Sequence, residues 1–233
     1  DVIVYLCNNQ KIYLRKKYLI PKSQEYIIAN GIDKDYYNTE SLGKVNYNRL
    51  RIQYGIPIAE KLIVKVARIS PEKGHQVAID ALLILHSQFN QKTHLLFVGG
   101  GDPSYILSLK YYAESKNIQK YIHFVDAQVD VRKFYYIADI FTLTSKSETF
   151  SLAALEAMAF GLPISLTNIG GASEMMIEGV TGQLAKPNNA FSIAASWNNI
   201  HLNLKKGDHI RQYFLKNFTA DRMLQDYVNL LIN

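Results

Sequence analysis

The chain has 233 residues, which suits one large domain or one domain with an appendage. Of these residues 48% are apolar and 20% charged, which is a globular composition and argues against disorder over the whole chain. Its formal net charge of +6 favours phosphates or other anionic partners, but the charge is scattered, and we expect no nucleic-acid partner. The single cysteine, Cys7, excludes an internal disulfide and a cysteine metal cluster. No run of 18 apolar residues and no basic-then-apolar leader occurs, so we expect no transmembrane helix, no signal peptide and a cytoplasmic location.

The first 46 residues predict two short strands around a basic helix. We expect strands at 2–6 and 25–28, a helix at 9–18 and a polar connection over 31–46. A basic helix on a basic chain allows contact with an anionic surface, so peripheral contact at the inner membrane surface is a hypothesis.

From residue 60 onward, short apolar runs alternate with longer amphipathic ones. Strands that are apolar throughout, joined by crossover helices, are typical of a parallel sheet covered on both sides. The sequence therefore predicts an α/β fold: a Rossmann-like open parallel sheet with helices on both faces over 25–187, and carboxyl-terminal helices over 188–233 that pack on it. The expected strands are 62–67, 95–98, 122–125, 140–143 and 163–166, and the expected helices are 71–88, 105–115, 131–138, 151–160 and 172–177.

Two cations follow the first of these strands. Arg68 ends the strand, and Ser70 with Pro71 forms a typical helix start. Arg68 and Lys73 would then flank the free N–H groups of a helix amino terminus, which is a natural seat for a diphosphate. The alternative is an ordinary capped helix with two exposed cations, which the spacing alone slightly favours.

Glycines follow the next strand, at Gly99, Gly100 and Gly101. They allow the backbone to approach a ligand closely, or they simply form a tight turn. No dinucleotide-type glycine fingerprint is present, so the glycines alone do not decide between the two.

Two glutamates mark the segment 147–163. Glu156 is the only charged residue between Phe150 and Ser165, on a helix that should be largely buried, so its carboxylate needs hydrogen-bond donors. Sugar hydroxyls, backbone N–H groups or an internal lysine would serve. Glu148 precedes the helix, whose start offers free N–H groups to a phosphate. An equally good interpretation is structural: Glu148 would interact with the helix dipole, and Glu156 would form a buried ion pair.

Other polar residues favour structural roles. Glu174, after Gly170-Gly171, is interpreted as plain helix capping. Asp33 and Asp35 favour turn chemistry over a metal pair. The residues His75, His94 and His123 lack partners at a recognisable spacing, and surface or structural roles are expected for them.

Together these residues resemble the carboxyl-terminal, donor-binding domain of the family 4 retaining glycosyltransferases of the GT-B fold. The resemblance runs from about residue 27 to 187, and its motifs are specific in combination. They are Asn30-Gly31-Ile32-Asp33, Arg68 with Lys73-Gly74, Gly99–Gly101, Ala138-Asp139, Ser145, Glu148 with Glu156, Gly161-Leu162-Pro163, Gly170-Gly171 with Glu174, Gly179 and Thr181-Gly182.

The resemblance implies a role for each matching position. Arg68 and Lys73 would hold the donor diphosphate and Glu148 would contact the transferred sugar, and these three are the expected catalytic residues. Glu156 would accept from the nucleotide ribose, and no metal ion or other cofactor is expected. Further donor-binding residues would be Gly99, Gly100 and Gly101, backbone N–H groups of Thr149, Phe150, Ser151 and Leu152, and Ala127, Gln128 and Val129 beside the base.

Three positions depart from the family pattern. Thr149 and Ser151 stand where glycines are common, and a positive φ at Thr149 would be strained. Asp126 also replaces a common glycine, which leaves the base and sugar preference open.

The resemblance implies a hexosyltransferase that moves a sugar from a UDP- or GDP-sugar to a glycan, lipid or other acceptor, with retention, in polysaccharide or glycolipid synthesis. The family's acceptor-binding domain is not in this chain, so residues 1–24 would be its remnant or a linker, and a partner domain or chain would be needed. Alternatives are a non-catalytic sugar-nucleotide-binding subunit, a glucan synthase or phosphorylase, and an epimerase. A nicotinamide-dependent dehydrogenase is disfavoured by the missing glycine fingerprint.

Overall fold

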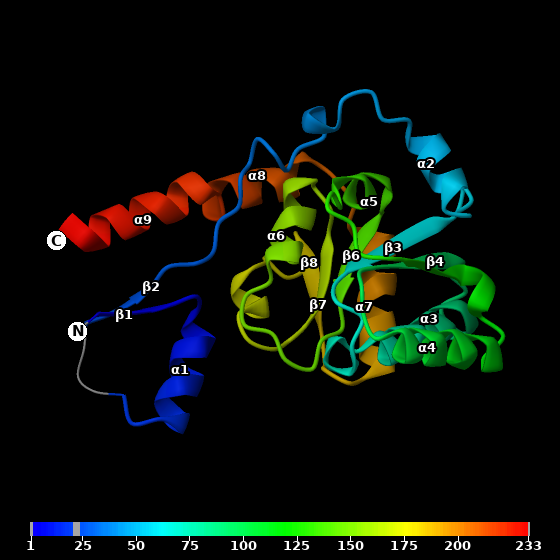
Figure 1. Ribbon diagram of the computed structural model, residues 1–233, viewed down its shortest axis with the longest axis horizontal. Helices are drawn as coiled ribbons and strands as arrows, with labels where there is room; N and C mark the ends of the chain where they lie inside the picture. The colour runs from blue at the N-terminus through cyan, green and yellow to red at the C-terminus, as the bar shows by residue number, and fades with distance from the viewer. Residues whose placement is uncertain (1, 21–23, 233) are drawn as a thin grey trace.

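The computed structural model describes residues 2–20 and 24–232, and its main body is a six-stranded parallel sheet (Figure 1). The strand order is β5-β4-β3-β6-β7-β8. This confirms the predicted α/β fold. The strands are β3 (Lys61–Val66), β4 (Thr93–Val98), β5 (Ile122–Val125), β6 (Ile140–Leu143), β7 (Ile164–Thr167) and β8 (Gly182–Ala185).

The order of the strands reverses between β3 and β6. From β3 the chain moves outward through β4 to the edge strand β5, and then returns to pair β6 with the other side of β3. In open α/β sheets such a switch point leaves a crevice beyond the carboxyl ends of the strands, where ligands bind. The loops after β3 and β6 meet at this crevice.

Helices cover both faces of the sheet (Figure 1). On one face, Ile63, Phe97 and Trp197 belong to a core with α3, α4 and α7. On the other face, Val64, Phe141 and Phe214 belong to a core with α5, α6 and α8. The helices are α3 (His75–Gln88), α4 (Pro103–Ser115), α5 (Arg132–Ile137), α6 (Leu152–Ala159), α7 (Ala190–Asn203) and α8 (Asp208–Asn217).

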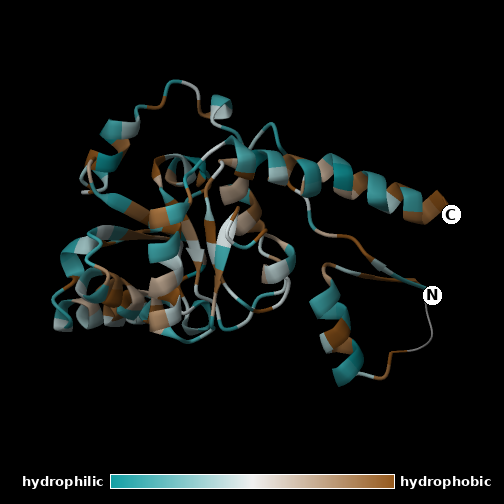
Figure 2. Cartoon of the chain, turned by 180° about the vertical axis from the view of Figure 1, so that it is seen from behind, coloured by the Kyte–Doolittle hydropathy of each residue, from teal (hydrophilic) through white to brown (hydrophobic). Residues whose placement is uncertain are grey.

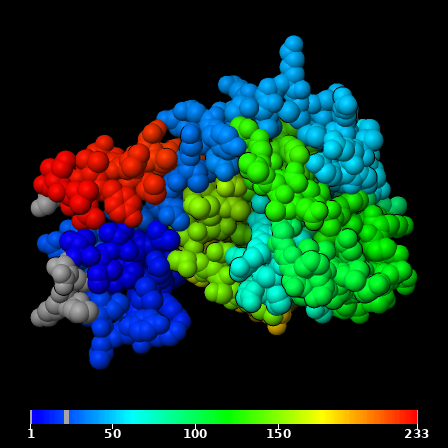
Figure 3. Space-filling view, viewed as in Figure 1, coloured from blue at the N-terminus to red at the C-terminus, as the bar shows by residue number. Residues whose placement is uncertain are grey.

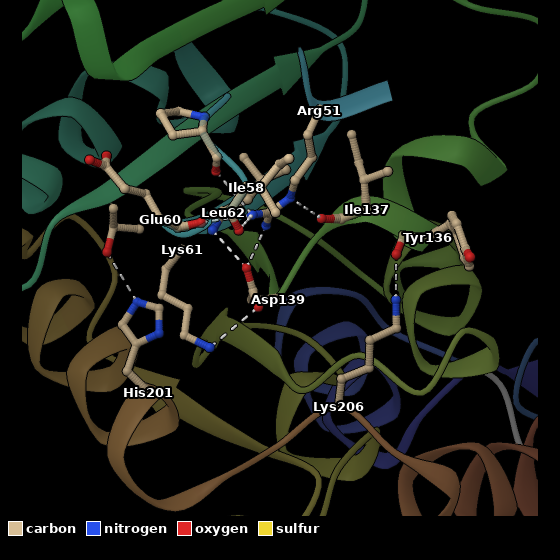
Figure 4. Close-up of polar contacts among 12 residues, drawn as sticks. Arg51, Ile58, Glu60, Lys61, Leu62, Tyr136, Ile137, Asp139, His201 and Lys206 are labelled. Carbon is tan, nitrogen blue, oxygen red and sulfur yellow. Dashed lines mark hydrogen bonds and ion pairs between the residues drawn. The ribbon is translucent and has the colours of Figure 1, made fainter. Parts of the chain in front are cut away.

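A buried arginine ties the helix α2 (Tyr47–Gln53) to the amino ends of the strands (Figure 4). The Arg51 guanidinium is 1% exposed and donates to the carbonyls of Glu60 at 2.7 Å and Ile137 at 3.1 Å, and to Asp139 at 2.7 Å. Asp139 also accepts from the backbone N–H of Leu62 at 2.9 Å. The Asp139 of the Ala138-Asp139 motif is therefore part of a structural anchor at the end of the sheet opposite the crevice.

The two ends of the described chain lie on the same side of the main body (Figure 1). Strands β1 (Val2–Tyr5) and β2 (Gln24–Ile27) form a separate parallel pair beside α1 (Asn8–Lys17). The helix α9 (Ala220–Ile232) has no buried residue, and apolar and polar residues alternate along it (Figure 2). Within the described ranges, no helix is long and apolar enough to cross a membrane.

Three expectations about the elements were wrong. The helix expected at 71–88 is split: a 3-10 turn at Pro71–Lys73 ends at Gly74, whose φ is +66°, and α3 begins at His75. The helix expected at 172–177 is only a 3-10 turn at Ala172–Glu174, since the Ile177 N–H donates to Thr181 Oγ1 instead. Strand β8 was not expected. The remaining 3-10 turns are Glu40–Leu42 and Gln119–Tyr121.

Candidate functional site

Most expected site residues lie at the carboxyl edge of the sheet, on the loops after β3, β4, β5 and β6, whereas Leu152 and Glu156 lie on α6. At the switch point, Lys73 Nζ lies 2.8 Å from Glu148 Oε2, and both side chains are half-buried. Such a partly exposed pair contributes about 0–1 kcal/mol to stability, so a stronger anion could displace it. Arg68 is exposed and has no hydrogen bond or ion pair to the described chain.

The start of α6 presents free backbone donors. Ser151 caps the helix, and its Oγ accepts from the Ala154 N–H at 3.2 Å, so the expected helix start is confirmed. Within residues 2–20 and 24–232, the N–H groups from Thr149 to Leu152 have no acceptor. These N–H groups and the positive end of the helix dipole suit an anion. Among the residues that the structure describes, the non-glycine residues with positive φ are Asn90, Asn117 and Asn188, so Thr149 carries no such strain.

The glycines after β4 pack one loop against another. A Cβ on Gly99 would lie 2.1 Å from the carbonyl oxygen of Ala67, and one on Gly101 would lie 2.1 Å from that of Ile69. A Cβ on Gly100 would meet only Ala127 at 3.4 Å. Close packing of the loops after β3 and β4 therefore accounts for Gly99 and Gly101 without a ligand.

The loop after β5 is open to solvent. Ala127, Gln128 and Val129 are all exposed, and Val129 is fully so. The loop begins beside the glycines of the β4 loop and is free to line a ligand.

Glu156 is held by two tyrosines that the sequence analysis missed. Tyr37 Oη donates to Glu156 Oε1 at 2.9 Å, and Tyr135 Oη donates to Oε2 at 2.6 Å. Burial raises the pKa of both phenols, so they stay protonated donors. The alternative of a structural ion pair at Glu156 is wrong, because the partners are neutral. Tyr37 is 119 residues away in sequence, and spacing gives no signal for it.

Helix α1 covers one side of the site. Glu174 accepts from the N–H groups of Asn8 at 2.8 Å and Asn9 at 3.0 Å, so it caps the distant helix α1. The expectation that Glu174 caps its own helix was wrong. The Asn9 side chain donates to the Gly170 carbonyl at 2.8 Å. In Figure 3 the blue amino-terminal segment meets the yellow-green part of the surface.

A cleft of about 540 Å³ lies between α1 and the loops after β6 and β7. It includes Glu148 and Thr149, so it adjoins the Lys73–Glu148 pair. A larger hollow of about 640 Å³ lies away from these residues, beside the edge strand β5. The cleft is lined by Asn9, Gln10, Tyr13, Lys146, Ser147, Glu148, Thr149, Asn168, Ile169 and Gly170.

A buried lysine lies beneath the site and was also missed. Lys65 is 0% exposed in β3, and burial lowers its pKa to about 7. The signal was in the sequence: Lys65 is the one charged residue inside the apolar run 62–67.

The histidines have structural places. His94 hydrogen-bonds through Nδ1 to His123 Nε2 at 2.8 Å and through Nε2 to Glu60 at 2.7 Å. Asp33 accepts from the N–H groups of Asp35 and Tyr36, which confirms the turn interpretation. In the described part of the chain, no group of three or more His, Cys, Asp or Glu residues is arranged to hold a metal ion.

A parallel sheet covered on both faces, with cations and free N–H groups at its switch point, defines an α/β domain suited to a phosphate-bearing ligand. The family model described as glycosyl transferases group 1 matches residues 46–216. The chain therefore belongs to the group 1 glycosyl transferases, and its fold is that of GT-B glycosyltransferases.

Individual relatives agree with this assignment. An uncharacterised glycosyltransferase of Methanocaldococcus jannaschii is 31% identical over 177 residues, which cover 75% of this chain and 44% of that protein. A glycosyltransferase of Rickettsia africae superposes with a TM-score of 0.86 at 26% identity, over 97% of this chain and 62% of the other. HepE of Anabaena, solved with UDP, shares the fold with a TM-score of 0.85 at 21% identity, over 99% and 63% of the two chains. The chain thus spans about half the length of the curated relatives it matches.

Proposed function

We propose that this chain binds the nucleoside-diphosphate-sugar donor of a retaining hexosyltransferase and forms the donor-binding half of its active site. The observations that carry the proposal lie at the switch point: the contact of Lys73 with Glu148, the exposed Arg68 on the loop after β3, and the free N–H groups at the start of α6. Group membership and the UDP bound to the structurally similar HepE support a UDP- or GDP-sugar as donor.

The donor's diphosphate would replace Glu148 as the partner of Lys73. A diphosphate carries more charge than a carboxylate and would also reach Arg68 and the α6 N–H groups, so the exchange is favourable. Glu148, once released, would accept hydrogen bonds from hydroxyls of the sugar. For Glu156 to accept from the ribose, Tyr37 would have to share or leave Oε1.

The family resemblance implies transfer with retention, and the arrangement could support it in the following way. The bond between the anomeric carbon and the diphosphate oxygen breaks, and the acceptor hydroxyl oxygen bonds to the same face of that carbon. The hydroxyl proton passes to the leaving diphosphate. Arg68 and Lys73 would stabilise the charge that develops on the leaving group. No step needs a metal ion or other cofactor.

An acceptor-binding half would complete the site. Leu224, Val228, Leu231 and Ile232 of α9 are exposed, as are Ile12 and Tyr13 of α1. A stripe of exposed apolar side chains of this kind favours contact with another domain or chain. We interpret residues 1–24 as a linker from, or remnant of, that half.

A thermal-shift titration tests donor binding. A ligand that binds the folded state raises the melting temperature with concentration, so one of UDP, GDP and ADP should do so, whereas NAD should not. Arg68→Ala should abolish the shift and Arg49→Ala, an exposed arginine on α2, should keep it. No shift with any nucleoside diphosphate would contradict the proposal.

The exposed apolar residues of α9 also favour a second candidate, a non-catalytic subunit that binds the donor and docks an acceptor-binding chain. A transfer assay separates the two. Turnover that is lost in Glu148→Gln supports catalysis, whereas donor binding without turnover, in the presence of the docked chain, supports the subunit.

Peripheral contact with an anionic membrane is proposed for α1. The exposed cations Arg15, Lys16 and Lys17 lie beside exposed Tyr18 and Leu19. Flotation with anionic liposomes should carry the chain upward, and no co-flotation would remove this proposal.

A further inference from the structure

Lys65 is a charged side chain in the centre of the sheet. It shares the α3-facing side of β3 with Ile63, its partner across the ladder is Phe97 of β4, and none of its surface is exposed. An ammonium group in such surroundings is costly unless hydrogen bonds compensate for the lost water. The contacts that compensate lead to the candidate site.

The Lys65 ammonium holds the turn that carries Lys73. Its Nζ donates to the Lys73 carbonyl at 2.6 Å and to Thr144 Oγ1 at 2.9 Å. Thr144 Oγ1 in turn donates to the Gly74 carbonyl at 2.7 Å. The turn also lies directly on β6, because a Cβ on Gly74 would be 2.1 Å from the Thr144 carbonyl oxygen. Lys65 therefore supports, from below, the turn whose side chain reaches Glu148.

The charges around Lys65 leave it poised between its two protonation states. Burial lowers the pKa of Lys65 to about 7, the positive charge of Lys73 adds to this effect, and Glu148 opposes it. His75, at the start of α3, faces Lys65, and its ring nitrogens have no hydrogen-bond partner in the described chain. Burial lowers the pKa of His75 to about 3. His75 is therefore neutral, and Glu148 is the one anion among these neighbours.

We propose that Lys65 is a proton-coupled positioning residue: a donor diphosphate bound at Lys73 draws a proton onto Lys65, and the charged ammonium then clamps the turn that presents Lys73. The inference rests on the proposed function. An added negative charge nearby favours the charged form of a base. By linkage, the protonated chain binds the donor more tightly than the neutral one.

The test is calorimetric titration at pH 7.5 in HEPES and in Tris buffer, which differ in ionisation heat. The probe is whichever of UDP-, GDP- and ADP-glucose gives the largest thermal shift. Its phosphates are diesters that do not titrate near neutral pH, so any proton taken up belongs to the protein. The wild-type chain should take up a measurable fraction of one proton for each donor bound. Its affinity should fall with rising pH above 7, approaching about tenfold per pH unit.

Lys65→Met should bind without proton uptake and with an affinity that is flat over the same pH range. Lys61→Met, at the exposed start of the same strand, should behave as the wild type. Donor binding by the wild type without proton uptake, or equal uptake by a folded Lys65→Met, overturns the inference and leaves the proposed function standing. No binding of any of the three sugar nucleotides by the wild type overturns both. Even if Lys65→Met does not fold, donor binding by the wild type without proton uptake, or with an affinity that is flat above pH 7, overturns the inference.

Discussion

Lys73 and Glu148 show how two residues 75 positions apart come to share one site. One follows β3 and the other follows β6, and these strands are neighbours in the sheet. Their residue types and places after apolar strands could be predicted from the sequence. The pairing itself, the tyrosines on Glu156 and the role of Glu174 could not be predicted, because they depend on contacts between distant segments.

Lys73→Met should weaken donor binding by about 10- to 100-fold, because it removes a charge-assisted contact to the diphosphate worth about 1.5–3 kcal/mol. Stability should change by no more than about 1 kcal/mol, since the pair with Glu148 is partly exposed. Calorimetric titration and urea unfolding measure the two effects, with Lys61→Met as the control. Unchanged donor affinity in Lys73→Met would argue against its role.

Lys65 should give stability a distinct pH dependence. Its folded pKa of about 7 lies below the ordinary 10.5, so between these values the unfolded chain binds the extra proton. Stability therefore rises with pH from 7 towards 10.5, by at most about 1.4 kcal/mol per pH unit from this group. Urea unfolding at pH 7, 8 and 9 should show the wild type gaining stability relative to Lys65→Met. Parallel curves would show that Lys65 stays charged in the folded chain across this range, which would contradict the lowered pKa.

Among the elements, the turn at Pro71–Gly74 departs most from the sequence-based prediction. The apolar period runs on through residues 71–88 and predicts one helix, but Gly74 breaks it where the chain lies on β6. Strand β8 was not predicted because its four residues, GQLA, include only two apolar side chains. The other strands and most helices were predicted within a few residues, since their burial leaves a clear apolar period.

Gly74→Ala should destabilise the chain by about 1–3 kcal/mol and weaken donor binding as well. The added Cβ meets the Thr144 carbonyl, and the φ of +66° is unfavourable for alanine. Gly179→Ala is the matched control: its φ is +79°, but its Cβ would meet only the Gln183 side chain, at 4.0 Å. Chemical unfolding and donor titration of both variants separate the φ effect from the contact. Equal losses in the two variants would contradict the importance of close packing at Gly74.

In the whole molecule, the amino-terminal segment belongs to the site more closely than the sequence indicated. The helix α1 is basic and has no apolar period that would predict packing against the sheet domain. It contacts that domain through hydrogen bonds to the Glu174 carboxylate and the Gly170 carbonyl instead. The described chain therefore forms both walls of a cleft, with α1 on one side and the loops after β6 and β7 on the other.

The molecule as a whole should lose stability in mild acid. Burial lowers the pKa of His75 to about 3 and those of His123 and His201 to about 4, all below the ordinary 6.5. Between 6.5 and 4 the unfolded chain binds these protons and the folded chain does not, so stability falls as the pH falls. The slope is at most about 1.4 kcal/mol per pH unit for each histidine, and it approaches this limit only below pH 6. Urea unfolding at pH 7, 6 and 5 measures this loss of stability. The slope should be shallower in His75→Phe than in the wild type. A stability that does not change between pH 7 and 5 would refute the prediction.

The central claim is that a nucleoside diphosphate binds at the switch point between β3 and β6. A co-crystal structure of the chain with the nucleoside diphosphate that gives the largest thermal shift tests this most directly. The account predicts diphosphate density in contact with Arg68 and Lys73 and within hydrogen-bond distance of the N–H groups that begin α6, with Glu148 released from Lys73. Density in the hollow beside β5, with the Lys73–Glu148 pair intact, would contradict it.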